Sequence, residues 1–316
     1  MPPGFWVRDG LVPRLLSPVA ALVAGSTARR VARPGWRAPV PVLCCGNAGV
    51  GGAGKTTLAL DLVRRLQARG VRVHCLTRGY GGRVRGVLRV DPSLHDAALV
   101  GDEPLLLAVA APTWVAADRA AGARAAVGKG AEALVMDDGL QNPGLVQDLA
   151  LLVVDGATGF GNGRVLPAGP LREPVAAAAA RCRAAVLVGA DLAGARNTLP
   201  RSLPVLTARL LPDQDLQGRR VLAFAGIARP SKFHATLREA GAEVAATADF
   251  PDHHPFTPAE LDRVLRRADA LGAVPATTPK DAVRLPPAVR AAVLVVGVSL
   301  AWDDPAEIEA MLDGLL

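Results

Sequence analysis

One glycine-rich segment of the chain has the residue types and spacing of a phosphate-binding loop. Residues 49–56 read Gly-Val-Gly-Gly-Ala-Gly-Lys-Thr, which fits the pattern G-x-x-x-x-G-K-[ST]. Glycines at these positions let backbone N–H groups approach phosphate oxygens, and a helix that begins here adds positive potential. Lys55 would reach the β- and γ-phosphates of a bound nucleotide, and the Thr56 hydroxyl would ligate Mg²⁺. The positions expected to bind the nucleotide are Gly49, Gly51, Gly52, Ala53, Gly54, Lys55, Thr56 and Thr57.

Two adjacent carboxylates, Asp137 and Asp138, follow the apolar run 134–136. A phosphate loop needs a carboxylate at the end of a neighbouring strand to hold Mg²⁺, and either or both of these side chains would coordinate it directly or through water. The alternative is an aspartate pair that caps the next turn at Gly139.

The acceptor of the phosphoryl group must be inferred from other residues. The chain has no N-K-x-D guanine-reading motif, and residues 137–139 do not make the D-x-x-G switch. A kinase needs a group that receives the proton of the acceptor hydroxyl. Asp102, which precedes an apolar helix, is equally suited to be that base or a helix N-cap. His253 and His254 lie in a predicted turn, where a histidine pair is by default solvated.

Sequence spacing cannot bring Asp102 and His253 together; only the fold can. A second function therefore stays open at this point, a phosphate-loop ATPase of the partition or metallochaperone type that acts as a regulatory switch. Such ATPases share the Gly-Gly-x-Gly-Lys-Thr-Thr pattern, but the partition type usually carries a lysine near the start of the loop, where this chain has Val50.

The elements that must position these residues follow a strand, turn, helix, strand order. Apolar runs at 42–45 and 71–76 flank a helix predicted over 56–68, which makes a βαβ unit. Further strands are expected at 133–136, 149–154 and 184–188, each separated by enough chain for a crossover helix. This order predicts an α/β fold, a phosphate-loop NTPase-like parallel sheet domain over residues 38–215.

A second, smaller α/β domain is predicted over residues 216–316, after a linker at 211–216. Its expected strands and helices alternate along the chain: strands at 220–224, 242–246, 273–277 and 292–296, and helices at 231–240 and 258–271. Because Asp102 belongs to the first unit and His253 to the second, the active site is expected in the cleft between them.

Residues 1–37 form an N-terminal amphipathic segment. The pattern over 5–31 predicts two short helical pieces, the second starting at Ser17 and Pro18, a good N-cap and first-turn pair. Apolar side chains on one face and arginines after them suit a helix lying in a membrane interface. The alternative is a helix that packs on the core of the protein itself.

Composition and charge limit the class of protein. With 316 residues, 50% hydrophobic and 21% charged, the chain is too apolar to be intrinsically disordered. Its net charge of +7 is concentrated in two zones: residues 1–40 carry six Arg and one Asp, and residues 62–90 carry eight Arg and no acidic residue. The remainder is mildly acidic, so anionic partners are expected near the N-terminus and no nucleic acid partner is expected.

Cysteine spacing and hydropathy bear on the compartment. The four cysteines form no CxxC pair, which is typical of a reducing environment. The longest uncharged stretch, 38–54, is too rich in Gly, Pro and Asn to span a membrane, and the first residues do not make a signal peptide. A cytosolic location is expected.

Taken in order, eight motifs resemble those of the tetraacyldisaccharide 4'-kinase family, the lipid A 4'-kinases of Gram-negative envelope synthesis. They are G-N-A-G-V-G-G-A-G-K-T from Gly46, T-R-G-Y-G-G from Thr77, G-D-E-P from Gly101, D-D-G-L-Q from Asp137, G-N-G-R-V-L-P-A-G-P-L-R-E-P from Gly161, F-A-G-I-A-R-P from Phe224, F-P-D-H from Phe250 and K-D-A-V from Lys280. The phosphate loop alone is generic, whereas the 161–174 run combined with G-D-E-P and F-P-D-H is specific to this family.

The resemblance implies an activity and a location. The γ-phosphate of ATP would pass to the 4'-hydroxyl of an acylated glucosamine disaccharide 1-phosphate. The enzyme would be peripheral, at the cytoplasmic face of the bacterial inner membrane, in contact with an anionic membrane surface.

The resemblance also implies residue roles. Asp102 would be the general base, His253 the partner that orients or tunes it, and Lys55 a group on the transferring phosphate. Thr56 and the pair Asp137 and Asp138 would bind Mg²⁺, with Glu173 a further acidic group near the metal. Arg78, Tyr80 and Arg172 would contact the substrate, although a plain turn is the alternative at residues 78–80.

Overall fold

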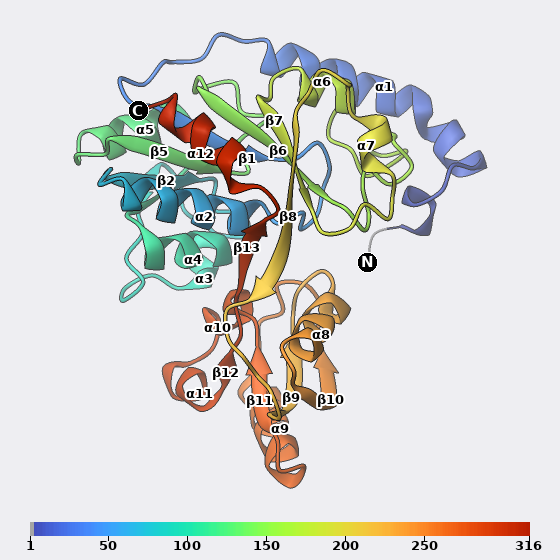
Figure 1. The fold of residues 1–316 in the computed structure, drawn as a ribbon, viewed down its shortest axis with the longest axis vertical. Helices are drawn as coiled ribbons and strands as arrows, with labels where there is room; N and C mark the ends of the chain where they lie inside the picture. Colours follow the sequence, from blue (N-terminus) through green and yellow to red (C-terminus); the bar gives the residue numbers. More distant parts are fainter. Residues whose placement is uncertain (1–2) are drawn as a thin grey trace.

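In the computed structural model, which describes residues 3–316, a nine-stranded sheet organises the larger of two units (Figure 1). The strand order is β13-β8-β7-β6-β1-β5-β2-β4-β3, and every neighbouring pair is parallel except β13 with β8 and β3 with β4. The strands are β1 (Val42–Gly46), β2 (Val73–Thr77), β3 (Val87–Arg89), β4 (Thr113–Ala116), β5 (Ala133–Asp137), β6 (Leu149–Asp155), β7 (Ala184–Val188), β8 (Val205–Pro212) and β13 (Val298–Trp302).

Helices cover both faces of this sheet, which is why its central strands are continuous apolar runs rather than alternating ones. The core of one face is closed by α2 (Lys55–Ala68), α4 (Asp102–Ala110) and α12 (Pro305–Asp313). The other face is covered by α1 (Leu11–Val31), α5 (Arg119–Val127), α6 (Val175–Ala179) and α7 (Ala195–Thr198). Two short elements, η1 (Gly4–Trp6) and α3 (Ala97–Val100), precede α1 and α4.

The smaller unit is a four-stranded parallel sheet in the order β10-β9-β11-β12. Helix α8 (Pro230–Glu239) packs on one face and α9 (Pro258–Ala270) on the other, each through its apolar stripe. The remaining elements are β9 (Arg220–Ala225), β10 (Glu243–Asp249), β11 (Val274–Thr277), β12 (Leu294–Val295), α10 (Pro279–Ala282) and α11 (Pro287–Ala292). The predicted α/β class is confirmed in both units.

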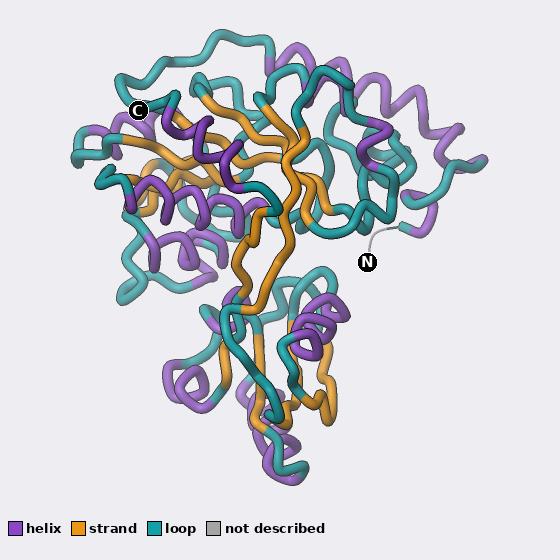
Figure 2. Tube along the Cα trace, in the orientation of Figure 1, coloured by secondary structure: helices purple, strands orange, loops and turns teal. Residues whose placement is uncertain are grey.

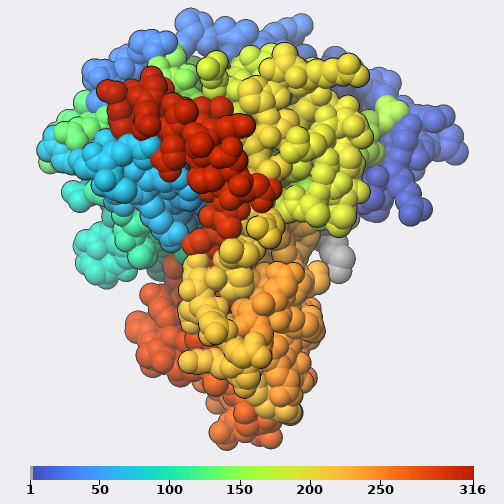
Figure 3. All heavy atoms as spheres, viewed as in Figure 1, coloured from blue at the N-terminus to red at the C-terminus, as the bar shows by residue number. Residues whose placement is uncertain are grey.

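The connection between the units differs from the sequence-based boundary. The predicted linker 211–216 begins inside β8, which continues to Pro212 and pairs antiparallel with β13. Residues 298–316 therefore return to the larger unit, on which Figure 2 marks the C-terminus. The second unit ends near Gly297 rather than at residue 316. The cause is packing: Ile308 and Leu312 of α12 are buried against the core of the larger unit, where the space-filling view shows this helix in red (Figure 3).

The N-terminal segment also departs from the prediction of two helical pieces divided at Ser17. Helix α1 runs unbroken through Pro18. Proline removes one backbone donor and normally disrupts a helix interior. Here Leu16, Ala20 and Val23 pack on the core of the larger unit, and this packing outweighs the local Ser-Pro signal. Residues 1 and 2 of the predicted segment lie outside the described residues.

Candidate active site

The phosphate loop joins the end of β1 to the start of α2. Gly51 and Gly54 have φ angles of 116° and 96°, a region that side-chain-bearing residues rarely adopt, so glycine is required at both positions. The Val50 N–H donates to the Pro170 carbonyl over 2.9 Å, which ties the loop to the 161–174 segment. The predicted strand, loop and helix order is therefore present at the residues of the motif.

Lys55 and Arg172 converge on Asp138. The Lys55 ammonium lies 3.8 Å from Asp138 Oδ1 and donates to the Gly51 carbonyl over 3.2 Å. The Arg172 guanidinium donates to both carboxylate oxygens of Asp138, over 2.8 and 3.0 Å. Burial alone would raise the pKa of Asp138, but the Lys55 and Arg172 charges hold it below its usual value. Arg172, expected at the substrate, thus lies beside the predicted metal pair.

Asp137 is the more deeply buried member of the pair. It ends β5 in register with Cys45 of β1, beside the phosphate loop, and its Oδ2 accepts a hydrogen bond from the Thr56 hydroxyl over 2.8 Å. Burial and the nearby Glu103 charge raise the pKa of Asp137 to about 7, while Lys55 and the Thr56 hydrogen bond act in the opposite direction. The carboxylates of the pair accept hydrogen bonds from Thr56 and Arg172, and among residues 3–316 neither makes a capping hydrogen bond to the Gly139 turn.

The residues present fit a Mg²⁺ ion. Oδ1 of Asp137 is buried and has no hydrogen-bond partner among residues 3–316, and the Thr56 hydroxyl lies beside the same carboxylate. An oxygen without a partner next to a hydroxyl is a donor set that Mg²⁺ uses. Within the described part of the chain no group of three or more His, Cys, Asp or Glu side chains could hold a metal. Most ligands of the ion would therefore be nucleotide oxygens and water, as is usual for Mg²⁺.

Glu173 does not lie directly on this pair. It is buried, and its Oε1 accepts hydrogen bonds from Arg181 over 2.7 Å and from Gln141 over 2.8 Å. Gln141 in turn accepts from Arg172 over 3.2 Å. The predicted acidic group near the metal is thus connected to Asp138 through two intervening side chains.

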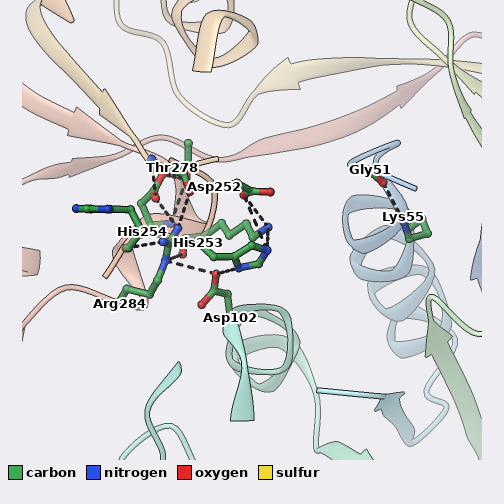
Figure 4. Close-up of polar contacts among 11 residues, drawn as sticks. Gly51, Lys55, Asp102, Asp252, His253, His254, Thr278 and Arg284 are labelled. Atoms are coloured by element: carbon green, nitrogen blue, oxygen red, sulfur yellow. Dashed lines mark hydrogen bonds and ion pairs between the residues drawn. The ribbon is translucent and has the colours of Figure 1, made fainter. Parts of the chain in front are cut away.

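The fold brings Asp102 and His253 together, which their separation of 151 positions could not show. Asp102 is the first residue of α4 and its side chain makes no capping hydrogen bond; Gly101 is the N-cap. Instead Asp102 Oδ2 lies 2.8 Å from Nδ1 of His253, which the smaller unit contributes (Figure 4). The other carboxylate oxygen, Oδ1, accepts no hydrogen bond from residues 3–316.

His253 is held in an unusual backbone conformation, with φ of 59°. Its N–H donates to the Gly226 carbonyl over 3.0 Å, and its ring lies 6.0 Å from that of Tyr80. Such a conformation costs about 1–3 kcal/mol and is found mainly at functional sites. His254 has a different partner, because its Nε2 lies 3.0 Å from Glu260 at the start of α9. The histidine in contact with Asp102 is therefore His253.

Three charged residues of this site had no role assigned from the sequence. Arg284, 7% exposed, places Nε 3.4 Å from Asp102 Oδ2 and donates to Asp281 over 2.6 Å. It also donates to the His254 and Gly226 carbonyls. Lys280 Nζ lies 3.3 Å from Nε2 of His253. In the sequence, the K-D-A-V motif could have pointed to Lys280 and Asp281, because it contains both residues. Arg284 lies just after this motif and is not part of it.

A cavity of about 1030 Å³ opens beside Asp102 and His253, with walls from both units. Tyr80 lines it, as expected for a substrate contact, and so do apolar side chains including Leu94, Val109 and Phe256. Arg78 is exposed and lies near Arg119, whose pKa is lowered to about 10 by burial and by the Arg78 charge. The structure thus places a cavity beside a carboxylate of which one oxygen, Oδ2, contacts His253 and Arg284.

Comparison with known proteins gives one consistent result. The family model described as Tetraacyldisaccharide-1-P 4'-kinase matches residues 12–316. The tetraacyldisaccharide 4'-kinase of Gluconacetobacter diazotrophicus is 61% identical over 98% of this chain and 97% of its own length, and that of Rhodospirillum centenum is 56% identical over 99% and 96%. The crystal structure of LpxK from Aquifex aeolicus in complex with ATP superposes with a TM-score of 0.77 at 26% identity, covering 96% of this chain and 99% of that one.

Proposed function

The chain belongs to the tetraacyldisaccharide-1-P 4'-kinase family, and from this premise we propose that Asp102 is the base of its reaction, oriented by His253. The enzyme phosphorylates a lipid A precursor at its 4' position with ATP as the donor. The membership favours the kinase over the regulatory ATPase. The observation that carries the proposal is the contact between Asp102 and His253 beside the cavity.

In the proposed mechanism the role of each residue follows from its position in the site. The acceptor sugar lies in the cavity, where Asp102 receives the proton of its hydroxyl on Oδ1 as the oxygen attacks the γ-phosphorus, the bond from that phosphorus to the β–γ bridging oxygen breaks and ADP leaves. His253 and Arg284 hold Oδ2 and keep the carboxylate aimed. Lys55 moves from its contact with the Gly51 carbonyl to the transferring phosphoryl group, where its charge stabilises the transition state. Mg²⁺, bound through Thr56, Asp137 and Asp138, would neutralise phosphate charge.

The remaining site residues take supporting roles. Tyr80 and Arg78 would contact the acceptor from the loop after β2, since Tyr80 lines the cavity. Arg172 would bind phosphate once a metal ion competes for its partner Asp138. Glu173 would act on the metal site through Gln141 and Arg172 rather than as a ligand.

Helix α1 supplies the proposed membrane contact. It has 21 residues, and an 18-residue window within it has a mean hydropathy of 1.4, which makes the helix long and apolar enough to cross a membrane; 17% of that window is buried. Leu11, Leu15 and Leu22 are 79%, 78% and 75% exposed, while the opposite face packs on the larger unit. Because one face is already docked, we propose that the helix lies in the interface, at the cytoplasmic face of the inner membrane, near anionic lipid. In this proposal the two arrangements predicted for the helix coexist: one face is docked on the larger unit, and the other face lies in the membrane interface.

Replacement of Asp102 by alanine tests the base. The expected result is a fall in kcat of about 10²–10⁴-fold in an assay with ATP, Mg²⁺ and tetraacyldisaccharide 1-phosphate, because proton transfer is lost. The Kd for a fluorescent ATP analogue should stay close to that of the unaltered enzyme, since Asp102 is not in the phosphate loop. A kcat within threefold of the unaltered enzyme would mean that Asp102 is structural.

A further inference from the structure

A line of three charged or polar groups ends at the proposed base. Lys280 Nζ lies 3.3 Å from Nε2 of His253, and Nδ1 of the same ring lies 2.8 Å from Oδ2 of Asp102. An ammonium has three donors and no acceptor, so Nε2 must accept. Nδ1 then carries the ring proton and donates it to the carboxylate, which is an acceptor when ionised. The donor-only chemistry of the Lys280 ammonium therefore sets the direction of both hydrogen bonds.

The other states of the ring fit this surrounding less well. A ring protonated on Nε2 would turn that proton toward the ammonium and would face Asp102 with a lone pair. A doubly protonated ring would place a second positive charge 3.3 Å from Lys280. Asp252 could offset this charge only weakly, because its Oδ1 is 3.9 Å from Nε2, 3.7 Å from Lys280 and 40% exposed.

The other groups around the ring complete this environment. Arg284 faces Asp102 Oδ2 rather than the imidazole, at 3.4 Å. The ring of Tyr80, from the larger unit, lies 6.0 Å from the imidazole at a tilted angle. Lys280 is thus the group in contact with Nε2 that can select a tautomer.

Lys280 is itself carried by a short, hydrogen-bonded helix. It lies in α10, whose N-cap Thr278 accepts the Asp281 N–H through its hydroxyl oxygen over 3.1 Å. The fully buried Asp281 carboxylate accepts the Gly226 N–H over 3.0 Å, in the segment whose Gly226 carbonyl binds His253. Helix α10 also packs against α4, which begins at Asp102. Lys280, His253 and Asp102 therefore lie on segments of the chain that contact one another.

We propose that Lys280 is a positioning residue of the phosphoryl-transfer reaction, whose ammonium holds His253 as the neutral, Nδ1-protonated tautomer that orients Asp102. The proposal rests on the proposed function, because it needs Asp102 as the base. Lys280 touches neither ATP nor the acceptor in this role; it acts through the imidazole alone.

Kinetics of Lys280 variants test the proposal. Lys280→Met removes the donor and should lower kcat by about 10–100-fold, the range found when a group that orients a metal-binding histidine is removed, with little change in the KM for ATP. Lys280→Arg keeps a cationic donor and should recover most of the activity. Lys129→Met, the same change at an exposed lysine, is the matched control and should leave kcat unchanged. In a His253→Ala background Lys280→Met should have little further effect, because its route to Asp102 is gone.

Nitrogen NMR of the histidine rings gives a readout that a merely structural role would not move. The chain has five histidines, and the signals of His253 are those lost in His253→Ala. The expected spectrum shows the proton on Nδ1 in the unaltered protein and loss of that single tautomer in Lys280→Met, with an unchanged melting temperature. Persistence of the Nδ1-protonated ring in Lys280→Met overturns the proposal. So does a loss of kcat on Lys280→Met that is equal in the unaltered protein and in the His253→Ala variant. Full activity of Asp102→Ala would instead overturn the proposed base and leave the tautomer result standing.

Discussion

Replacing Asp155 with asparagine should loosen the contact between the two units without altering the phosphate loop. Asp155 ends β6, is 4% exposed, and accepts hydrogen bonds from Lys232 over 3.1 Å and from Arg229, both in the smaller unit. Its Oδ1 also accepts the Ala157 N–H over 3.1 Å. Asparagine can still accept that turn hydrogen bond, so the substitution removes mainly the charge.

The size of the effect follows from burial on the two sides of the contact. A hydrogen bond to a charged group contributes about 1.5–3 kcal/mol. Arg229 and Lys232 are 35% and 41% exposed, and solvent screening reduces their share. We therefore expect the substitution to lower the free energy of local opening by about 1.5 kcal/mol, the lower end of that range. This corresponds to an increase of about tenfold in the opening equilibrium constant.

Amide hydrogen exchange of the 226–232 segment is the assay, because it reports local opening rather than global unfolding. Exchange there should be about tenfold faster in Asp155→Asn, with kcat reduced by a few-fold since Gly226 in this segment holds His253. Asp262→Asn, which breaks an exposed ion pair with Arg266 in α9, is the control and should change neither quantity.

The pH dependence of this contact has a definite sign. Burial alone would raise the pKa of Asp155, but the Arg229 hydrogen bond and the Lys232 and Arg229 charges hold it below the usual 3.8. The stabilisation is therefore fully present above pH 4 and is lost as the pH falls through the lowered pKa. The exchange difference between Asp155→Asn and the unaltered protein should shrink in that acidic range. Equal exchange of the two proteins at pH 7 would refute the assignment of an interdomain contact to Asp155.

Three further outcomes are expected. Asp137→Asn should raise the Mg²⁺ concentration for half-maximal activity by about tenfold, measured by titration at fixed ATP, and an unchanged value would remove Asp137 from the metal site. Arg284→Met should lower the stability of the protein by about 3 kcal/mol, seen as a lower melting temperature, because it leaves the buried Asp281 carboxylate without its cation. Leu15→Ser combined with Leu22→Ser should reduce sedimentation with anionic vesicles while leaving the melting temperature unchanged; undiminished sedimentation would contradict the interfacial helix.

The sequence predicted local features better than contacts between distant segments. The phosphate loop and Asp137 were readable because strand ends and glycines in a fixed pattern place groups within a few residues of one another. The return of residues 298–316 was not readable, since a five-residue strand and a short amphipathic helix suit either sheet. The prediction of a helix break at Ser17 and Pro18 was wrong, because the packing of α1 on the core of the larger unit outweighs the local sequence signal.

The site shows the same division. Asp102 could be read as a base or as an N-cap, and only the contact with His253 across the two units separates these alternatives in the structure. The resemblance named both residues without their geometry. Arg284 carries no pattern of its own, because its partners Asp102 and Gly226 are distant in sequence.

A double-mutant cycle on Asp102 and His253 tests most directly the claim that they act as one unit. Asp102→Asn keeps a hydrogen-bond acceptor but cannot take a proton, so kcat should fall by about 10²–10⁴-fold in the lipid phosphorylation assay. His253→Ala should cost less, and adding it to Asp102→Asn should produce almost no further loss, as is found for residues that work together. Losses that multiply in the double variant would contradict the account.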